Sequence, residues 1–487
     1  MPTTTKNLPG LAKLSMSDFQ SHRDNFFAKM TDNSVAFFPA ATETTRSNDT
    51  EFAFCQNKNF YYLTGFNEPN ALLILLKQSD SEQAILFSLP KDRKHEIWHG
   101  RRVGQAHACQ EYGFDQCFTL VEQDDLIAQY LHGLSQVYFA FDDEQLSQQI
   151  FGYLAQVRAN VRQGAKVPTQ LNDASPIINE LRLIKSANEI ELMRQVNFIS
   201  GLAHQRAMQK TQAGLFEYQI ENEILHEFTR YGARYAAYAT IVAGGDNANI
   251  LHYTNNGEQL QNSDLLLIDA GGELSGYAAD ITRTFPINGK FTEPQKSLYQ
   301  LVLDTKSTVI AAIKPGITFA KLNHIAHQCL TQGLVELGIL TGDLTELVKD
   351  KACKKYFIHG LGHWLGLDVH DVGDYHSNEA KAQLREFLPS MVLTIEPGLY
   401  MPLDDKNIAK KWRGIGIRIE DNIVVTEHGC ENLTANCPET IAEIEALMAV
   451  GRHERSEARQ NIAEAGEYTS VCSDTSHSCD VSIDLQK

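Results

Sequence analysis

The sequence lacks a long hydrophobic run, a secretory signal and a CxxC motif. Its longest apolar runs, such as 71–76 and 265–268, are far shorter than the ~20 residues of a membrane-spanning helix. The first residues, MPTTTKNLPGLAKLSM, have no charged, apolar and small-residue segments in the order of a signal peptide. The nine cysteines are an odd number and are widely spread. We therefore expect a cytoplasmic protein with reduced thiols, no membrane partner and no zinc ribbon or redox motif.

The chain also lacks an excess of positive charge. It has 43 Lys and Arg against 61 Asp and Glu, which gives a formal net charge of -18. A protein this acidic is poorly suited to bind nucleic acid or an anionic membrane. Apolar residues make up 43% and charged residues 21%, as in soluble globular proteins, and 487 residues predict two to four domains. This composition fits a soluble enzyme, including one whose carboxylates hold cations.

Up to about residue 170, short apolar runs alternate with helical stretches. These runs predict strands near 71–77, 83–88 and 137–141 in a mixed α/β domain. The polar, proline-containing stretch 163–176 predicts a linker that ends this domain.

A second domain begins after this stretch. Apolar residues at helical spacing predict one long helix here, with Ser175 and Pro176 as its cap and first turn. The end of the chain, 451–487, has one aromatic residue and no sustained apolar stripe, so we expect it to be mostly disordered apart from a helical start.

Two segments of the second domain resemble each other. LLLIDAGG (265–272) and VLTIEPGL (392–399) are apolar strands that end in Ile, a carboxylate, a small residue or proline, and Gly. Each is followed by a strand with another carboxylate, in GYAADITRTF and GIGIRIEDNIVV. Two matching halves that each supply two acids would suit a pseudo-symmetric fold with one central site. The four acids are Asp269, Asp280, Glu396 and Glu420.

Each of these acids also has a simpler interpretation. Asp269 at the end of a strand is compatible with a turn former, although Asp280 lies inside an otherwise apolar strand. Arg418 and Glu420 alone would fit the solvated face of an edge strand. Four carboxylates in one low-dielectric site, however, repel one another strongly unless cations neutralise them. The set of four therefore favours a pair of metal ions.

Histidines are dense in HGLGHWLGLDVHDVG (359–373). His359 and His363 are four residues apart, as in the HExxH zinc helix, but the glutamate of that motif is missing and Gly360 and Gly362 disfavour a helix. His370 follows in an alternating, strand-like segment. A lone histidine is more often a satisfied polar residue than a ligand. Three within twelve residues, beside four strand-end acids, favour a site.

The ligand types predict the metal. One imidazole with four carboxylates is a hard, oxygen-rich set, which favours Mn²⁺ or a similar ion over a metal that prefers thiolates. Two bridged ions about 3.5–4 Å apart could activate a hydroxide between them.

These motifs resemble the metal-dependent aminopeptidase P and prolidase family, whose catalytic domain has the pita-bread fold. The matching segments, in family order, are LLLIDAGGELSGYAADITRTFP, HGLGHWLGLDVHDVG, LTIEPGLY and GIRIEDNI, with ILHYTNN upstream. NFYYLTGFNEP is similar to the amino-terminal domain of that family. The resemblance covers roughly residues 15–450. It implies an α/β (α+β) chain with a mixed α/β aminopeptidase P domain over 1–174, a pita-bread (creatinase/aminopeptidase) catalytic domain over 175–450, and a tail over 451–487.

Carried over residue by residue, the resemblance implies a role for each candidate. The metal ligands would be Asp269, Asp280, His363, Glu396 and Glu420, with Asp280 and Glu420 bridging two divalent ions. His359 would stabilise the tetrahedral intermediate, His370 would contact the substrate carbonyl, and Glu396 would carry a proton towards the leaving nitrogen. His252, Tyr238, Tyr400 and Arg418 would bind substrate or steady the ligands.

The implied reaction releases the first residue of peptides with proline in the second position, by attack of a metal-bridging hydroxide. Because the proline nitrogen carries no hydrogen and its φ is fixed, a site shaped for this bond accepts substrates that ordinary peptidases handle poorly. Trp364 after His363 resembles the bacterial type of aminopeptidase P. The alternatives are a prolidase, which cleaves only dipeptides, and a non-hydrolytic or metal-free relative such as creatinase. All five ligands are present, which favours hydrolysis. The resemblance also implies a homo-oligomer, a dimer or a tetramer.

Overall fold

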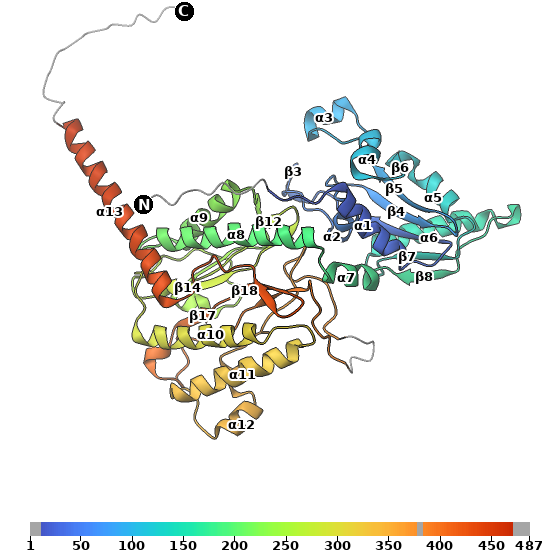
Figure 1. Cartoon of the computed structure of the whole chain (residues 1–487). Helices are drawn as coiled ribbons and strands as arrows, with labels where there is room; N and C mark the ends of the chain where they lie inside the picture. The colour runs from blue at the N-terminus through green and yellow to red at the C-terminus, as the bar shows by residue number, and fades with distance from the viewer. Residues whose placement is uncertain (1–10, 377–382, 471–487) are drawn as a thin grey trace, which may run out of the picture.

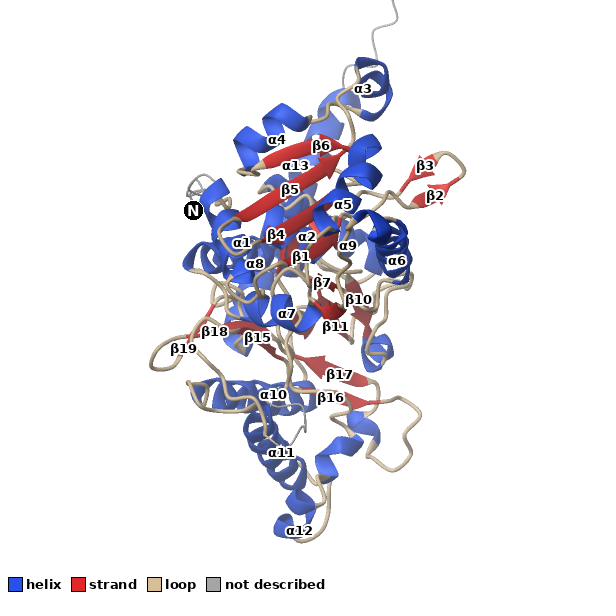
Figure 2. Cartoon of the chain, turned by 90° about the vertical axis from the view of Figure 1, so that its right-hand side faces the viewer, coloured by secondary structure: helices blue, strands red, loops and turns tan. Residues whose placement is uncertain are grey.

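The computed structural model describes residues 11–376 and 383–470, which form two domains lying side by side (Figure 1). The N-terminal domain is built on a mixed six-stranded sheet with the order β6-β5-β4-β1-β7-β8 (Figure 2). Its strands are β1 (Ser34–Pro39), β4 (Leu72–Lys77), β5 (Glu82–Ser88), β6 (Gln116–Thr119), β7 (Gln136–Phe139) and β8 (Gln170–Asp173). A short hairpin of β2 (Thr45–Ser47) and β3 (Thr50–Glu51) is exposed and separate from this sheet. The three strands predicted from apolar runs are confirmed as β4, β5 and β7.

Helices cover both faces of this sheet. Along β1, Val35 and Phe37 point into one core and Ala36 and Phe38 into the other, because successive side chains of a strand alternate between faces. Residues of α5 (Gln123–Leu131) and α6 (Glu144–Ala159) complete the first core. The second core is larger, continues into the C-terminal domain and contains residues of α1 (Met16–Phe27), α2 (Lys58–Thr64) and α4 (Gln105–Tyr112). The exposed α3 (Arg93–His99) has no buried residue.

The segment between the domains differs from the prediction in two ways. The stretch 163–176 is not a free linker, because β8 lies within it and pairs with β7 in parallel. The single long helix is wrong as well: α7 (Ser175–Leu183) and α8 (Ala187–Lys210) are separate. Ser175 is the first residue of α7 and not its cap, whereas Ser186 caps α8 and forms a capping box with Glu189. The capping signal at Ser186 therefore begins a second helix, which is separate from α7.

The C-terminal domain contains two small antiparallel sheets of similar design. One has the order β10-β11-β14, and the other has the order β15-β18-β19. Further strands pair as β13-β12-β9 and β16-β17. The bounds are β9 (Tyr235–Ala236), β10 (Ile241–Gly244), β11 (Leu265–Asp269), β12 (Gly272–Leu274), β13 (Tyr277–Ala278), β14 (Thr282–Pro286), β15 (Val392–Ile395), β16 (Gly398–Met401), β17 (Ile415–Arg418), β18 (Asp421–Val425) and β19 (Cys430–Asn432). The faint sequence similarity of the two segments thus corresponds to two comparable strand arrangements.

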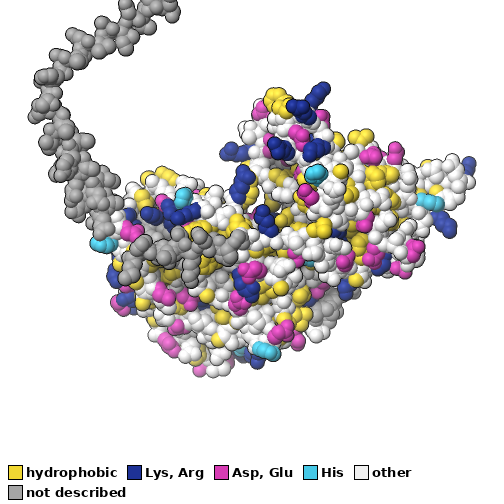
Figure 3. Space-filling view, turned by 45° about the horizontal axis from the view of Figure 1, so that its top comes forward, with side chains coloured by type: hydrophobic (Ala, Val, Ile, Leu, Met, Phe, Trp, Pro, Cys, Tyr) yellow, Lys and Arg dark blue, Asp and Glu magenta, His cyan; other side chains and the backbone are white. Residues whose placement is uncertain are grey.

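Helices surround these strands. α8 and α9 (Glu217–Arg230) lie against the first half, and α10 (Glu293–Ala311) lies against the second. α11 (Phe319–Glu336) packs on α10 and is followed by the short α12 (Leu344–Lys349) (Figure 1). Among the described residues, no helix combines the length and the apolar character that crossing a membrane requires. Both basic and acidic side chains lie on each domain in the face shown in Figure 3.

The last helix, α13 (Ile441–Ser470), packs against α8 at its beginning. From residue 451 we predicted a mostly disordered tail after a helical start, whereas helix α13 extends to Ser470. The sequence EARQNIAEA in this part is rich in residues of high helix propensity, which explains the continuation without an apolar face. Residues 471–487, with Cys472 and Cys479, lie outside the described part of the chain.

A buried ion cluster joins the two halves of the C-terminal domain. Asp421 of β18 is completely buried and accepts hydrogen bonds from Arg283 of β14 at 2.7 Å and from Lys306 of α10. Lys306 also pairs with Glu439. Burial alone would raise the pKa of Asp421, but the two cations hold it well below its ordinary value. The carboxylate therefore stays charged, and it fixes β18 against β14 and α10.

Asp421→Asn should destabilise the protein by about 3–5 kcal/mol, because it leaves buried cations without their counter-charge. The free energy of unfolding is measured in a urea titration. The matched control is Glu431→Gln, which removes the half-exposed partner of Arg194 and should change that free energy by at most ~1 kcal/mol. Equal effects of the two substitutions would contradict a structural role for the buried cluster.

Candidate metal centre

Four carboxylates and four histidines line one cavity of about 380 Å³ in the C-terminal domain. Asp269 ends β11, Asp280 lies between β13 and β14, Glu396 follows β15, and Glu420 lies between β17 and β18. Each half of the domain thus contributes two acids from corresponding places, at the end of one strand and before the next. The remaining lining residues are Leu251, His252, His359, Gly360, Gly362, His363, His370, Tyr375 and Arg418.

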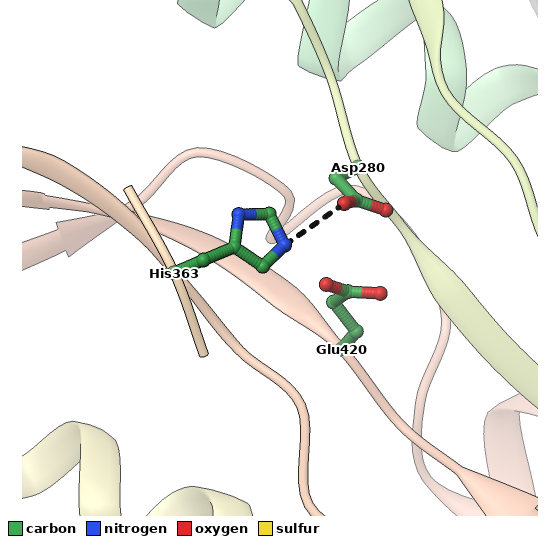
Figure 4. Close-up of side chains that lie close together, drawn as sticks. All are labelled: Asp280, His363 and Glu420. Carbon is green, nitrogen blue, oxygen red and sulfur yellow. Dashed lines mark ion pairs between the residues drawn. The ribbon is translucent and has the colours of Figure 1, made fainter. Parts of the chain in front are cut away.

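Asp280, His363 and Glu420 point towards one another from three different segments (Figure 4). One ligand atom of each lies within 4.8 Å of the others. His363 Nε2 is 3.4 Å from Asp280 Oδ2 and 3.8 Å from Glu396 Oε1. His363 Nδ1 is 2.9 Å from the carbonyl oxygen of Trp364, which can only accept a hydrogen bond. Nδ1 therefore carries the proton, and the lone pair of Nε2 faces the acids, as a metal ligand requires.

The backbone next to His363 packs closely against strand β15. A Cβ atom at Gly362 would lie 1.9 Å from the carbonyl oxygen of Thr394, so only glycine fits beside β15. The backbone N–H groups of His363 and Thr394 then donate to the Thr394 hydroxyl and the His363 carbonyl, respectively. This stretch is not helical, as the glycines predicted. His370 lies in a turn, so the strand-like interpretation of its segment is wrong; the turn is closed by the bond from Asp371 N to Trp364 O.

Neutral and cationic donors hold the carboxylates from behind. Tyr238 donates towards Asp269 and Asp280, with O–O distances of 2.5 and 2.6 Å, and Arg418 donates to Asp269 at 2.7 Å. Thr282 donates to Glu420 at 2.7 Å. These donors leave other carboxylate oxygens facing the cavity. Arg418 and Glu420 are both buried, so the solvated-edge alternative for this pair is excluded.

The acids strongly affect one another's ionisation. Burial and the charge of Asp269 raise the pKa of Asp280 well above its ordinary value, and burial and the charges of Asp280 and Asp269 do the same to Glu420. Burial and the charge of Glu420 raise the pKa of Glu396 to about 8. A single nearby arginine, Arg418, cannot balance four acids. The site therefore fits divalent cations, because they would remove the repulsion that otherwise keeps protons on these carboxyls.

His359 and His370 occupy different environments. His359 Nδ1 donates to the carbonyl of Gly360 at 2.7 Å, so Nε2 accepts from the Tyr400 hydroxyl, also at 2.7 Å. Burial and the charge of Arg418 lower the pKa of His359 to about 4, so the ring is neutral near pH 7. His370 is exposed at the cavity, with its ring centroid 4.2 Å from that of His363. Burial and neighbouring His363 lower its pKa as well.

The four residues predicted to bind substrate or steady the ligands divide into two pairs. His252 is exposed at the cavity wall, and Arg418 lines the cavity. Tyr238 and Tyr400 do not line it; their hydroxyls lie behind the acids and behind His359. Each hydroxyl is hydrogen-bonded to residues of the site, which is the position from which a tyrosine can steady the acids or His359.

Some residues around the site were not predicted as part of it. Asn422 forms two hydrogen bonds with the backbone of Asp280, and Thr282 holds Glu420. Tyr375 lines the cavity and stacks on Trp364. Asn422 directly follows the acidic pair in GIRIEDN, so its polar side chain in an apolar strand was the signal available.

Comparisons with known proteins agree with this arrangement. The model of metallopeptidase family M24 matches residues 191–427, and that of the aminopeptidase P N-terminal domain matches residues 19–138. The Xaa-Pro aminopeptidase of Escherichia coli strain K12 is 45% identical over 444 residues, which is 91% of this chain and 100% of that protein. The chain belongs to metallopeptidase family M24.

Two solved structures of this M24 relative have the same fold. Aminopeptidase P from E. coli with the inhibitor Pro-Leu superposes with a TM-score of 0.88 at 44% identity, over 91% of this chain and 100% of that one. The zinc-substituted E. coli enzyme in complex with product has a TM-score of 0.87 at 44% identity, over 90% and 99%. The two-domain architecture, with a pita-bread catalytic domain, is therefore established for this M24 member.

The raised carboxyl pKa values predict how the metal-free protein responds to pH. Glu396 holds a proton up to about pH 8 when folded, against an ordinary pKa of 4.5. Its contribution to stability is fully present below pH 4.5 and is lost as pH rises through about 8. The melting temperature of chelator-treated protein should fall over this range, and divalent metal should raise it most at the alkaline end. Glu396→Gln is the control and should flatten the fall; an unchanged pH dependence in this variant would contradict the assignment.

Proposed function

We propose that the protein is a metal-dependent Xaa-Pro aminopeptidase, which releases the N-terminal residue from peptides with proline in the second position. The observation that carries this proposal is the convergence of four acids and His363 in one cavity, with His359 and His370 beside them. The proposal is further supported by the E. coli Xaa-Pro aminopeptidase, which this chain covers along its whole length.

In this proposal, Asp269, Asp280, His363, Glu396 and Glu420 would hold the divalent ions. When bound, divalent ions would polarise the scissile carbonyl and lower the pKa of water, which provides a nucleophile near neutral pH. We propose Mn²⁺ for this oxygen-rich set. One solved relative is zinc-substituted, so metal reconstitution of this chain must compare the two ions.

Glu396 is the residue that we propose to move the proton. Its Oε2 atom lies 3.6 Å from His359 Nδ1, and its Oε1 atom faces His363. A carboxylate whose pKa is easily raised by its neighbours can take a proton from the attacking water and return it to the leaving proline nitrogen. That nitrogen must be protonated before it can leave, because an amide anion is too basic.

His359 and His370 act on the substrate in this proposal. A neutral His359 is suited to hydrogen bonding at the reacting centre, and its orientation is set by Gly360 and Tyr400. To stabilise the tetrahedral intermediate, the Nδ1–H of His359 would turn from the Gly360 carbonyl to the developing oxyanion. His370 at the exposed side of the cavity would contact the substrate carbonyl, and His252 lies near both rings. We also propose that the enzyme is a cytoplasmic homo-oligomer, a dimer or a tetramer, which light scattering can test.

Metal-reconstituted protein should release the first residue from both Xaa-Pro dipeptides and longer Xaa-Pro peptides, measured by chromatography of the products. A chelator should abolish this activity, and Mn²⁺ should restore it best. Peptides with alanine in the second position are the control and should be poor substrates. Cleavage of dipeptides alone would indicate a prolidase, and full activity in metal-stripped protein would exclude the proposed chemistry.

Alanine variants of the three histidines should differ in bound metal and in turnover. His363→Ala should lose bound metal, because it removes the only nitrogen ligand. His359→Ala and His370→Ala should keep their metal and lose turnover by ~10²-fold or more, as expected for a positioned acid-base group or oxyanion donor. Metal analysis and kinetics on the three purified variants test this division. It is wrong if His359→Ala or His370→Ala loses metal as His363→Ala does.

A further inference from the structure

His370 stands in a loop whose position is fixed from outside the cavity. Among the described residues, no protein atom forms a hydrogen bond with its exposed ring, which only packs edge-on against His363. The orientation of the ring must therefore come from the backbone on either side. The next residue, Asp371, has a completely different environment, because its side chain is only 1% exposed.

Asp371 is held by two cations from the segment that joins the domains. Arg182 Nη2 donates to Asp371 Oδ1 at 2.6 Å, and Lys185 Nζ donates to Oδ2 at 3.0 Å. Both cationic side chains are almost fully buried. Gly366 makes room for this carboxylate, since a Cβ atom there would lie 2.1 Å from Asp371 Oδ2. The contact is therefore built into the turn.

Arg182 connects this turn to the N-terminal domain. Its Nη2 atom also donates to Asp368 at 2.7 Å, and its Nη1 atom donates to Asn59 of α2 at 2.7 Å. The planar guanidinium thus ties both ends of the segment 368–371 and one helix of the other domain. The two buried cations thus face the buried carboxylate of Asp371 and the partly exposed carboxylate of Asp368. A lysine at position 182 could not reproduce this fork.

We propose that Arg182 is a positioning residue for the reaction, which acts through Asp371 to hold the loop that carries His370 at the substrate. This inference rests on the proposed aminopeptidase function. Arg182 itself lies outside the cavity lining and is not a ligand candidate. A loop displaced by about 1 Å can cost up to ~10²-fold in rate when it carries a reacting group.

The test is a double-mutant cycle with the full-length, metal-loaded enzyme. Arg182→Gln should lower kcat by about 10- to 10²-fold with little change in bound metal. In the His370→Ala background, the same substitution should change kcat by less than about 2-fold, because the group that it positions is already absent. Arg182→Lys should recover part of the activity, since it keeps the charge at Asp371. Arg194→Gln, which removes an exposed arginine paired with Glu431, is the matched control and should leave kcat unchanged.

The outcomes distinguish a failure of the proposed function from a failure of the positioning role. If wild-type enzyme does not cleave Xaa-Pro peptides, the proposed function fails. If it does, and the losses from Arg182→Gln and His370→Ala multiply in the double variant, the positioning role is wrong. Loss of metal in Arg182→Gln would also overturn it, because the residue would then act on His363. If Arg182→Gln is insoluble, the cycle is run with Arg182→Lys, for which the same non-additivity is expected.

Discussion

Four carboxylates cannot all stay ionised in one buried cavity without cations beside them, and much of the catalytic domain is organised around this constraint. Asp269 and Asp280 share the Tyr238 hydroxyl, and Arg418 supplies one positive charge. These groups orient the acids but do not neutralise them, so burial and the neighbouring acids raise the pKa of Glu396 to about 8 and those of Asp280 and Glu420 well above their ordinary values. The surrounding protein residues therefore do not balance the negative charge of the four acids, and divalent cations would balance it. The donors of the site are already in place, which lowers the reorganisation that binding would need.

A buried cluster next to the cavity acids holds them in place, and in this cluster the acid Asp421 is paired with the cations Arg283 and Lys306. Asp421 neighbours Glu420 in the chain, yet its pKa is lowered because Arg283 and Lys306 face it. Arg283 also donates to the carbonyl of Glu420. Adjacent acids thus have opposite roles: one holds the two halves together through internal cations, and the other faces the cavity. The pseudo-symmetry makes this possible, because each half offers a strand end on which an acid can be presented.

The candidate ligands could be proposed from the sequence because their positions give local signals. An acid at the end of an apolar strand, as at Asp269 and Glu396, is visible in a few residues, and the glycines around His363 exclude a helix. The break between α7 and α8 was missed because helical spacing continues across 184–186. Strand β8 was missed because it is a polar edge strand, with no apolar alternation to reveal it. The tyrosines could be named from the resemblance, but which side of the acids they occupy depends on packing that the sequence does not display.

Contacts across the domain seam have no local signal at all. Arg182 and Asp371 are 189 positions apart, and the sequence offers no reason to pair this arginine with that acid. The same seam also holds Lys58 against Glu273 at 2.9 Å, and His22 against Glu189, which accepts from Tyr277 as well. Lys58 thus contacts β12, and His22 contacts α8, whose Glu189 also holds Tyr277 of β13. Buried charges of this kind add little net stability, since desolvation offsets their attraction, but they strongly favour one arrangement over others. The N-terminal domain therefore helps to fix the turn that carries His370, because Asn59 accepts from the same Arg182 that holds Asp371.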